Sequence, residues 1–334
     1  MSRHGNAGAA VTSGTTAAMT AKEQKKIMRQ KKRKENRKLM KQNWILYLFI
    51  LPSFLYLIIF NYAPMFGVQI AFRDFNFVDG IFGSEWVGWK WFKKFLDTPR
   101  FWLLMKNTLK LSIYSLIAGF PLPIILALIL NNVQNAKWKK FAQTITYMPH
   151  FISTVVLVGM MSIFFSPSSG IVNTILSWFG FSGETYFMGK ASYFSHMYVW
   201  SGVWQGMGWS SIIYMSALAS VDQGLHEAAM IDGANKIKRV FYIDLPTIAP
   251  TIIIMLILNC GSLLGVGWEK VYLMQNDLNI TTSEVISTYV YKLGLQQQKY
   301  SYSSAIGLFN SVVNFIILAV VNKIAAKVSD TSLW

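Results

Sequence analysis

The chain has 334 residues, of which 53% are hydrophobic and only 14% are charged. Soluble domains usually have about 25% charged residues, so this composition indicates a membrane protein. A single cysteine, Cys260, excludes a disulfide framework and a cysteine-ligated zinc site. The net charge of +16 would favour a nucleic-acid partner in a soluble protein, so the position of the charges decides between these classes.

Most of the excess charge lies near the N-terminus. Eleven lysines and arginines fall between Lys22 and Lys41, against two acidic residues. This stretch has few apolar residues for an amphipathic helix, and the residues before it are mainly Ser, Thr, Gly and Ala. We expect residues 1–42 to be a disordered, basic, cytoplasmic tail, with a nucleic-acid arm as the alternative. Residues 43–327 are the expected transmembrane domain, and residues 328–334 a C-terminal tail.

Six stretches without Asp, Glu, Lys or Arg can each hold the roughly 20 apolar residues that cross a bilayer. They are residues 44–72, 111–136, 141–183, 191–221, 245–268 and 300–322. We expect spanning helices near 44–63, 109–130, 146–166, 196–218, 247–267 and 302–322. Because lipid offers the backbone no hydrogen-bond partners, the predicted fold class is an all-α integral membrane protein with six transmembrane helices.

The connecting segments predict the orientation. The connection after the second expected span carries three lysines between residues 137 and 140 and no acid, and Lys323 and Lys327 follow the sixth against Asp330. The segments after the first, third and fifth expected spans are nearly balanced in charge. Since positively charged connections stay in the cytoplasm, both termini are predicted to be cytoplasmic.

Two expected spans carry glycines at a spacing that lets another helix approach closely. Gly202, Gly206 and Gly208 lie in the fourth, and Gly261 and Gly265 lie in the fifth. Incidental glycine is the alternative.

The connection between the fourth and fifth expected spans, about residues 220–246, is predicted to be a short helix, a glycine bend and a second helix. Glu227 is expected in a first turn, where a carboxylate is favoured. Gly233 permits the bend, and Pro246 suits the first turn of the next span. An amphipathic surface connector is the alternative.

This loop resembles the cytoplasmic signature of permease subunits of binding-protein-dependent ABC importers. The signature is Glu-Ala-Ala, three residues, Gly, nine residues and Ile-x-Leu-Pro. It matches at every fixed position, namely Glu227, Ala228, Ala229, Gly233, Ile243, Leu245 and Pro246. The resemblance implies an ABC type I importer permease fold whose loop is a coupling helix in a cleft of a separate ATPase. It also makes Asp232, Lys236 and Arg239 candidates for charge pairs there.

Residues 148–153, 166–173 and 282–291 resemble the carbohydrate branch of these permeases, which includes importers of alginate and pectin fragments. The resemblance implies a permease subunit of an ATP-driven sugar importer in a bacterial cell membrane. It would form half of the pathway for an oligosaccharide delivered by an extracellular binding protein. The implied partners are a second homologous permease, two ATPase subunits, a sugar-binding lipoprotein and membrane lipid, without nucleic acid.

The sequence has no glycine-rich phosphate-binding loop followed by Lys-Ser/Thr. We therefore predict a non-catalytic chain without a cofactor, whose ATP and Mg belong to the partner ATPases. The histidines are too scattered to suggest a metal site, and His150 is expected to be structural.

Aromatic and amide side chains in the spans are the predicted substrate pathway. Aromatic rings stack on sugar CH groups, and polar residues within a span indicate function. Interfacial belts or packing are the alternative for each aromatic residue. The predicted set is Tyr198, Trp200, Trp204, Gln205, Trp209, Tyr214, Asn259, Asn310 and Asn314.

Outside the spans, Thr281 and Glu284 have the spacing of a capping box. This spacing predicts a helix over about residues 284–295. The helix would lie on the membrane surface or, as the resemblance implies, contact the binding protein.

Two alternative functions stay open. The importer could carry another solute, such as an amino acid or phosphate, because importers of many solutes share the coupling loop. An integral-membrane enzyme is the other alternative, but the sequence has no His-Glu-x-x-His, nucleophile motif or paired carboxylates within a span.

Overall fold

The computed structural model describes residues 21–181, 185–329 and 331–333. The described residues are mostly helical, with two strands of two residues each, which confirms the predicted all-α class. The chain divides into two compact units, residues 1–67 and residues 68–334. Each unit is described by itself below.

The first unit contains a basic helix and the start of an apolar one. Its helices are α1 (Ala21–Gln42), α2 (Trp44–Leu57), the wider turn η1 (Ile58–Tyr62) and α3 (Ala63–Met65). The structure differs from the expectation of a disordered tail over residues 21–42, where no Gly or Pro interrupts a run of good helix formers. The rest of that expected tail, residues 1–20, lies outside the described residues. The helical stretch Trp44–Phe72 is long and apolar enough to cross a membrane.

Three further stretches in the described residues meet the same test of length and hydropathy. The first joins α6 (Arg100–Gly119) to α7 (Pro121–Asn131). The second joins α13 (Lys236–Arg239), η4 (Val240–Asp244) and α14 (Leu245–Gly261), and the third is α18 (Tyr300–Ser329). Helix α11 (Ala191–Leu218) has 28 residues but is less apolar. The count of six spans therefore stays a prediction.

The single helix expected near residues 146–166 is wrong. That region consists of α8 (Ala136–Tyr147), the tight turn η3 (Met148–Phe151) and α9 (Thr154–Phe164), with a bend of 98° before α9. Ile152 and Ser153 are extended, and the Ser153 hydroxyl accepts a hydrogen bond from Val156 N. Ser153 therefore caps a new helix instead of continuing the old one.

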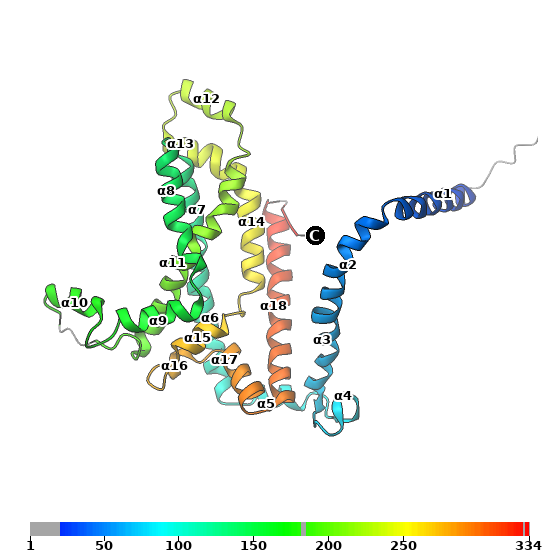
Figure 1. Ribbon diagram of the computed structural model, residues 1–334, viewed down its shortest axis with the longest axis horizontal. Helices are drawn as coiled ribbons and strands as arrows, with labels where there is room; N and C mark the ends of the chain where they lie inside the picture. Colours follow the sequence, from blue (N-terminus) through cyan, green and yellow to red (C-terminus); the bar gives the residue numbers. More distant parts are fainter. Residues whose placement is uncertain (1–20, 182–184, 330, 334) are drawn as a thin grey trace, which may run out of the picture. The chain divides into compact units, whose positions relative to one another are not determined.

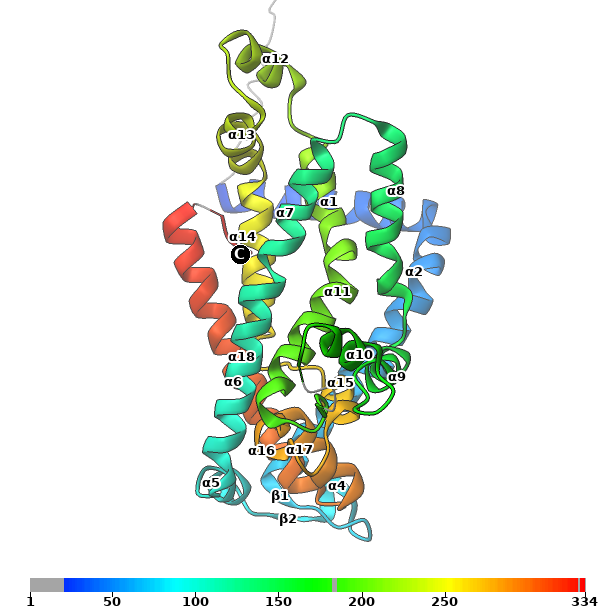
Figure 2. The same cartoon turned by 90° about the vertical axis from the view of Figure 1, so that its left-hand side faces the viewer.

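In the second unit, α11 packs against α6, α7 and α14, and α14 packs against α18 (Figure 1). The connection from α7 to α8, the loop before α14 and the end of α18 lie toward one end of this bundle (Figures 1 and 2). Helices α5 (Lys90–Leu96), α15 (Trp268–Met274), α16 (Ile280–Ser283) and α17 (Ile286–Tyr291) lie toward the other end. This arrangement agrees with the predicted division into cytoplasmic and external segments, and the direction in the membrane stays a prediction.

The segments at the second end form a packed cap. Within it, β1 (Arg73–Asp74) pairs antiparallel with β2 (Glu85–Trp86), and Arg73 lies opposite Trp86. Asn107 on α6 donates from Nδ2 to the carbonyls of Thr281 and Glu284, at 3.0 Å each. The remaining elements are η2 (Phe66–Phe72), α4 (Gly80–Gly83), α10 (Ile171–Trp178) and η5 (Lys292–Gln296).

The helix expected over residues 284–295 is present as α17 and η5, but the expected capping box is wrong. Glu284 ends α16 instead of lying in the first turn of the next helix. Thr288 takes that place, because its hydroxyl accepts a hydrogen bond from Val285 N at 3.2 Å.

The glycines of the expected packing motifs differ in their surroundings. A Cβ at Gly208 would lie 1.9 Å from the carbonyl oxygen of Thr146, so α11 passes very close to α8 there. A Cβ at Gly261 would lie 2.7 Å from the Leu318 side chain on α18, whereas one at Gly206 would meet nothing within 4 Å. Gly208 and Gly261 are thus close contacts between helices, and Gly206 is not.

Candidate functional site

The loop before α14 is built from two short helices separated by a bend. Its first helix, α12 (Gln223–Ile231), begins at Asp222, whose Oδ1 accepts a hydrogen bond from Gly224 N at 2.9 Å. Glu227 is the fifth residue of α12, so its expected place in the first turn is wrong. Asp222 supplies the carboxylate at this N-terminus.

The bend is a helix C-terminus closed by a left-handed glycine. Gly233 has φ +77°, Ala234 N donates to Ala229 O at 2.8 Å, and Gly233 N donates to Met230 O at 3.1 Å. These two bonds are the Schellman pattern, which satisfies carbonyls at the end of a helix. Asn235 then caps α13 by accepting a hydrogen bond from Lys238 N. The predicted helix, glycine bend and second helix are confirmed.

The two halves of the signature face different surroundings. Ile243 and Leu245 pack against the apolar cluster that holds Leu218 and Ile248. On α12, by contrast, Ile231 is 88% exposed, and Met230 and Leu225 are about half exposed. Sequence reasoning missed these apolar side chains because it followed the fixed positions of the signature. Their exposure on a short helix at the end of the bundle is typical of a docking surface.

One polar contact joins α12 to the base of α14. His226 Nε2 lies 3.2 Å from Asp244 Oδ1, and the Asp244 side chain is almost fully buried. His226 and Asp244 were not among the predicted coupling residues. The predicted charged side chains Glu227, Asp232, Lys236 and Arg239 form no ion pair within 4 Å in the described part of the chain. Glu227, Asp232 and Lys236 are exposed.

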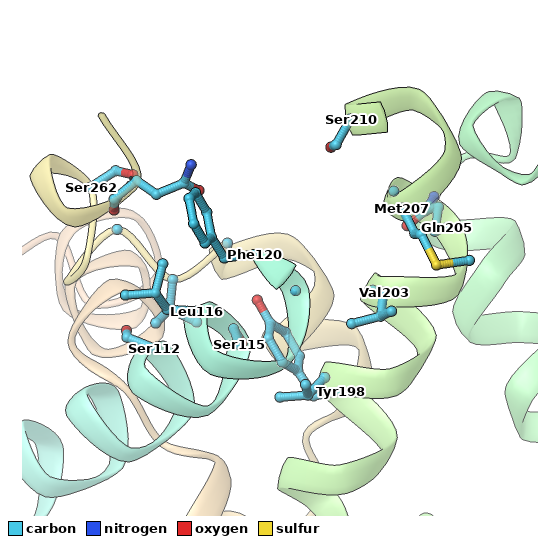
Figure 3. A pocket seen from close by; sticks show the side chains of 18 of the residues that line it. Ser112, Ser115, Leu116, Phe120, Tyr198, Val203, Gln205, Met207, Ser210 and Ser262 are labelled. Carbon is cyan, nitrogen blue, oxygen red and sulfur yellow. Dashed lines mark hydrogen bonds between the residues drawn. The ribbon is translucent and has the colours of Figure 1, made fainter. Parts of the chain in front are cut away.

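A cavity of about 390 Å³ lies within the bundle, between α6, α11, the end of α14 and α15. Figure 3 shows Tyr198 projecting from α11 toward the helix that carries Ser115 and Leu116. The polar side chains of its wall are Ser112, Ser115, Tyr198, Gln205, Ser210, Asn259, Ser262 and Lys270. Hydroxyl and amide groups therefore predominate, and among the described residues Lys270 is the one charged group of the wall.

Lys270 is 9% exposed, and its Nζ donates to the backbone carbonyl of Tyr198 at 2.9 Å. The ammonium also lies 4.8 Å from the centroid of the Tyr198 ring. Burial lowers the pKa of Lys270 to about 8, so the amine stays mostly charged at pH 7. Sequence reasoning missed Lys270 because it appeared as one charge in a balanced external segment.

The structure brings some of the predicted pathway residues to the cavity. Tyr198, Gln205 and Asn259 line it, with the Gln205 amide donating to Ile152 O at 2.7 Å. Trp200 and Trp204, about half exposed, do not line it.

Four further predicted residues lie outside the wall of the cavity. Tyr214 is buried in the apolar cluster beside Leu218, and Trp209 stacks on His150 with centroids 4.5 Å apart. Asn314 Oδ1 accepts a hydrogen bond from Leu264 N, and Asn310 Nδ2 donates to Leu264 O. These two amides thus hold the backbone of the segment that follows α14. In the described residues, no group of three His, Cys, Asp or Glu is placed to hold a metal ion.

The chain is similar to a protein family and to individual relatives. Residues 119–330 match the model of the binding-protein-dependent transport system inner membrane component. The chain is 43% identical to protein LplB of Bacillus subtilis strain 168, over 89% of this chain and 92% of the relative. It is 42% identical to the polygalacturonan/rhamnogalacturonan transport system permease protein YteP of the same strain, over 91% of this chain and 95% of the relative.

Solved structures of a bacterial ABC transporter that imports the acidic polysaccharide alginate are also similar. One has a TM-score of 0.81 and 38% identity, over 88% of this chain and 99% of the matched chain. Another, in complex with an alginate pentasaccharide-bound periplasmic protein, has the same score and identity.

Proposed function

Because this chain belongs to the family of inner membrane components of binding-protein-dependent transport systems, we propose that it forms half of the pathway for an oligosaccharide in an ATP-driven importer. The chain is a multi-pass membrane protein with the fold of an ABC importer permease. The observation that carries the proposal is the loop of residues 220–246, which contains the complete signature and presents its Glu-Ala-Ala part on the exposed helix α12 at one end of the bundle.

This loop couples the chain to a separate ATPase subunit. The exposed apolar side chains of α12 would enter a cleft of that partner, while Ile243 and Leu245 fix the base of the loop on the bundle. Movement of the partner would then pass into α14 through a short rigid connection and favour one of two states of the bundle. Glu227, Asp232, Lys236 and Arg239 are available for charge pairs in the cleft. ATP and Mg belong to that partner.

A carbohydrate substrate is supported by the relatives and by the wall of the cavity. YteP and the alginate importer are named for polysaccharide transport. The hydroxyl and amide groups of the wall are the donors and acceptors that sugar hydroxyl groups require. The exposed indoles of Trp200 and Trp204 are candidates for sugar stacking where a second permease completes the pathway.

An extracellular binding protein would deliver the sugar to the cap that includes α17 and η5. The periplasmic protein in one of the similar structures supports such a partner. With two ATPase subunits and the second permease, this gives a heteromeric complex.

The test is solute uptake by the complete complex in proteoliposomes, with oligosaccharides, amino acids and phosphate as probes. We expect ATP-dependent uptake of oligosaccharides alone. Uptake of amino acids or phosphate without any sugar would overturn the proposed substrate class. A double Trp200 and Trp204 alanine variant adds a second readout. We expect lower sugar uptake with ATPase activity largely retained, and unchanged uptake kinetics would remove the stacking role.

A further inference from the structure

The cavity holds a buried cation without a counter-ion. We propose that the Lys270 ammonium recognises an acidic group of the sugar, so that the transported oligosaccharide is anionic. This inference rests on the proposed function. It adds the charge of the substrate and the residue that recognises that charge.

The cost of burial is the first argument. Removing an ammonium from water is strongly unfavourable unless it is paired. Lys270 is 9% exposed, and its hydrogen-bond acceptor is the neutral Tyr198 carbonyl. No carboxylate in the described residues lies within 4 Å of Lys270 Nζ. An acidic ligand in the cavity would supply the missing charge.

The other buried charged side chain of the cap, Glu284, has partners of opposite charge. The Glu284 side chain is 7% exposed and has Arg100 at 3.6 Å and Lys292 at 4.0 Å. The absence of a counter-ion is therefore particular to Lys270, which faces the cavity, and is not general in this region. Buried charges without partners cluster at functional sites.

Geometry leaves the amine able to bind a ligand. An ammonium has three protons to donate, and the described contacts of Lys270 use one of them for the Tyr198 carbonyl. A Cβ at Gly202, which also lines the cavity, would lie 3.2 Å from Nζ. A side chain at that position would crowd the amine, so glycine keeps it accessible.

A purely structural role does not require the charge. The hydrogen bond from Lys270 to Tyr198 joins α15 to α11, and a neutral amide could donate it without the cost of burying an ammonium. Lys270→Gln is therefore the informative variant, because it keeps a donor and removes the charge. Lys190→Gln is the matched control, because Lys190 is exposed, lies near the Tyr193 ring and does not line the cavity.

The experiment measures uptake by the complete complex in proteoliposomes. The probes are oligogalacturonates and oligoalginates, their methyl esters of equal length, sulfated oligosaccharides and neutral arabino-oligosaccharides. The esters keep the size and hydroxyl pattern and lose the charge. Wild-type and variant complexes share one binding protein, so its own selectivity cancels in the comparison.

We expect wild-type complex to take up a uronic or sulfated probe with a KM at least 10-fold lower than that of a neutral one. Lys270→Gln should raise the KM for the acidic probe about 10-fold relative to the KM for the neutral one, and Lys190→Gln should leave this ratio at its wild-type value. Comparison of the uronic with the sulfated probes shows whether Lys270 recognises a carboxylate or a sulfate group.

Equal wild-type KM values for acid and ester, or an unchanged preference in Lys270→Gln, would overturn this inference while the proposed sugar import stands. Uptake of no sugar at all would overturn the proposed function itself. If Lys270→Gln does not assemble, binding of the acid and of its ester to the wild-type complex without the binding protein decides the question, and equal affinities would overturn the inference.

Discussion

Gly233 has a left-handed backbone and open space where a side chain would lie. Its φ is +77°, and a Cβ built there meets no atom within 4 Å. A substitution therefore acts through the left-handed backbone, which costs an ordinary L-residue about 1–2 kcal/mol. Proline cannot adopt this φ at all, whereas asparagine tolerates it comparatively well.

We predict that Gly233→Pro abolishes uptake, that Gly233→Val lowers it several-fold, and that Gly233→Asn retains most of it. All three should reach the membrane at normal levels, because the loop lies outside the packed bundle. Uptake per amount of complex is the measurement. Equal uptake by the Asn and Val variants would show that the bend is not required.

His226 and Asp244 link the exposed helix to the bundle. Removal of the imidazole would leave a buried carboxylate without its partner, which costs about 1–3 kcal/mol. We predict that His226→Ala lowers the thermal midpoint of the complex and reduces uptake more than ATPase activity. His226→Gln, which restores a donor, should recover part of both. A His226→Ala complex with normal uptake would argue against a role for this contact in coupling.

Among the elements, the approach of α11 to α8 depends on Gly208. A Cβ there would lie 1.9 Å from the Thr146 backbone oxygen, so one of the two helices must move. We predict that Gly208→Ala destabilises the complex by at least the roughly 1–3 kcal/mol of an overpacked core. Gly206→Ala is the control on the same helix, since its Cβ meets nothing within 4 Å. Equal thermal midpoints for the two variants would contradict this packing.

The length and hydropathy of the elements predicted much of the fold. The span expected near residues 302–322 lies within α18, whereas the span expected near 247–267 is helical in α14 only as far as Gly261. The bend at Ile152 and Ser153 was not predicted, because an apolar run does not reveal that a serine inside it caps a new helix. Helix α1 was missed because its stripe of apolar side chains is thin, although its helix propensity is good.

The candidate site was predictable where its residues are adjacent in sequence. The fixed spacing from Glu227 to Pro246 predicted the loop with its glycine bend. The cavity instead gathers residues from α6, α11, α14 and α15, and no local pattern shows that Lys270 meets Tyr198 across 72 positions. The predicted roles of the coupling and pathway residues stay predictions.

In the whole molecule, charge is distributed by position along the bundle. The lysines between residues 137 and 140 lie toward the end that carries α12, and the nearly balanced segments lie toward the cap (Figures 1 and 2). The distribution of charge along this unit is thus the basis of its predicted orientation in the membrane. Lys270 is the exception, because its charge lies on the wall of the cavity.

The orientation can be tested because the sequence contains one cysteine. With Cys260 replaced by serine, Gln134→Cys places a thiol in the exposed connection after α7, and Asp277→Cys places one on the exposed cap. Neither change removes a lysine or arginine that determines the topology. We predict that a membrane-impermeant maleimide labels position 277 in intact cells and position 134 only after lysis. Labelling of position 134 in intact cells would reverse the orientation and place the Glu227 loop away from any cytoplasmic ATPase.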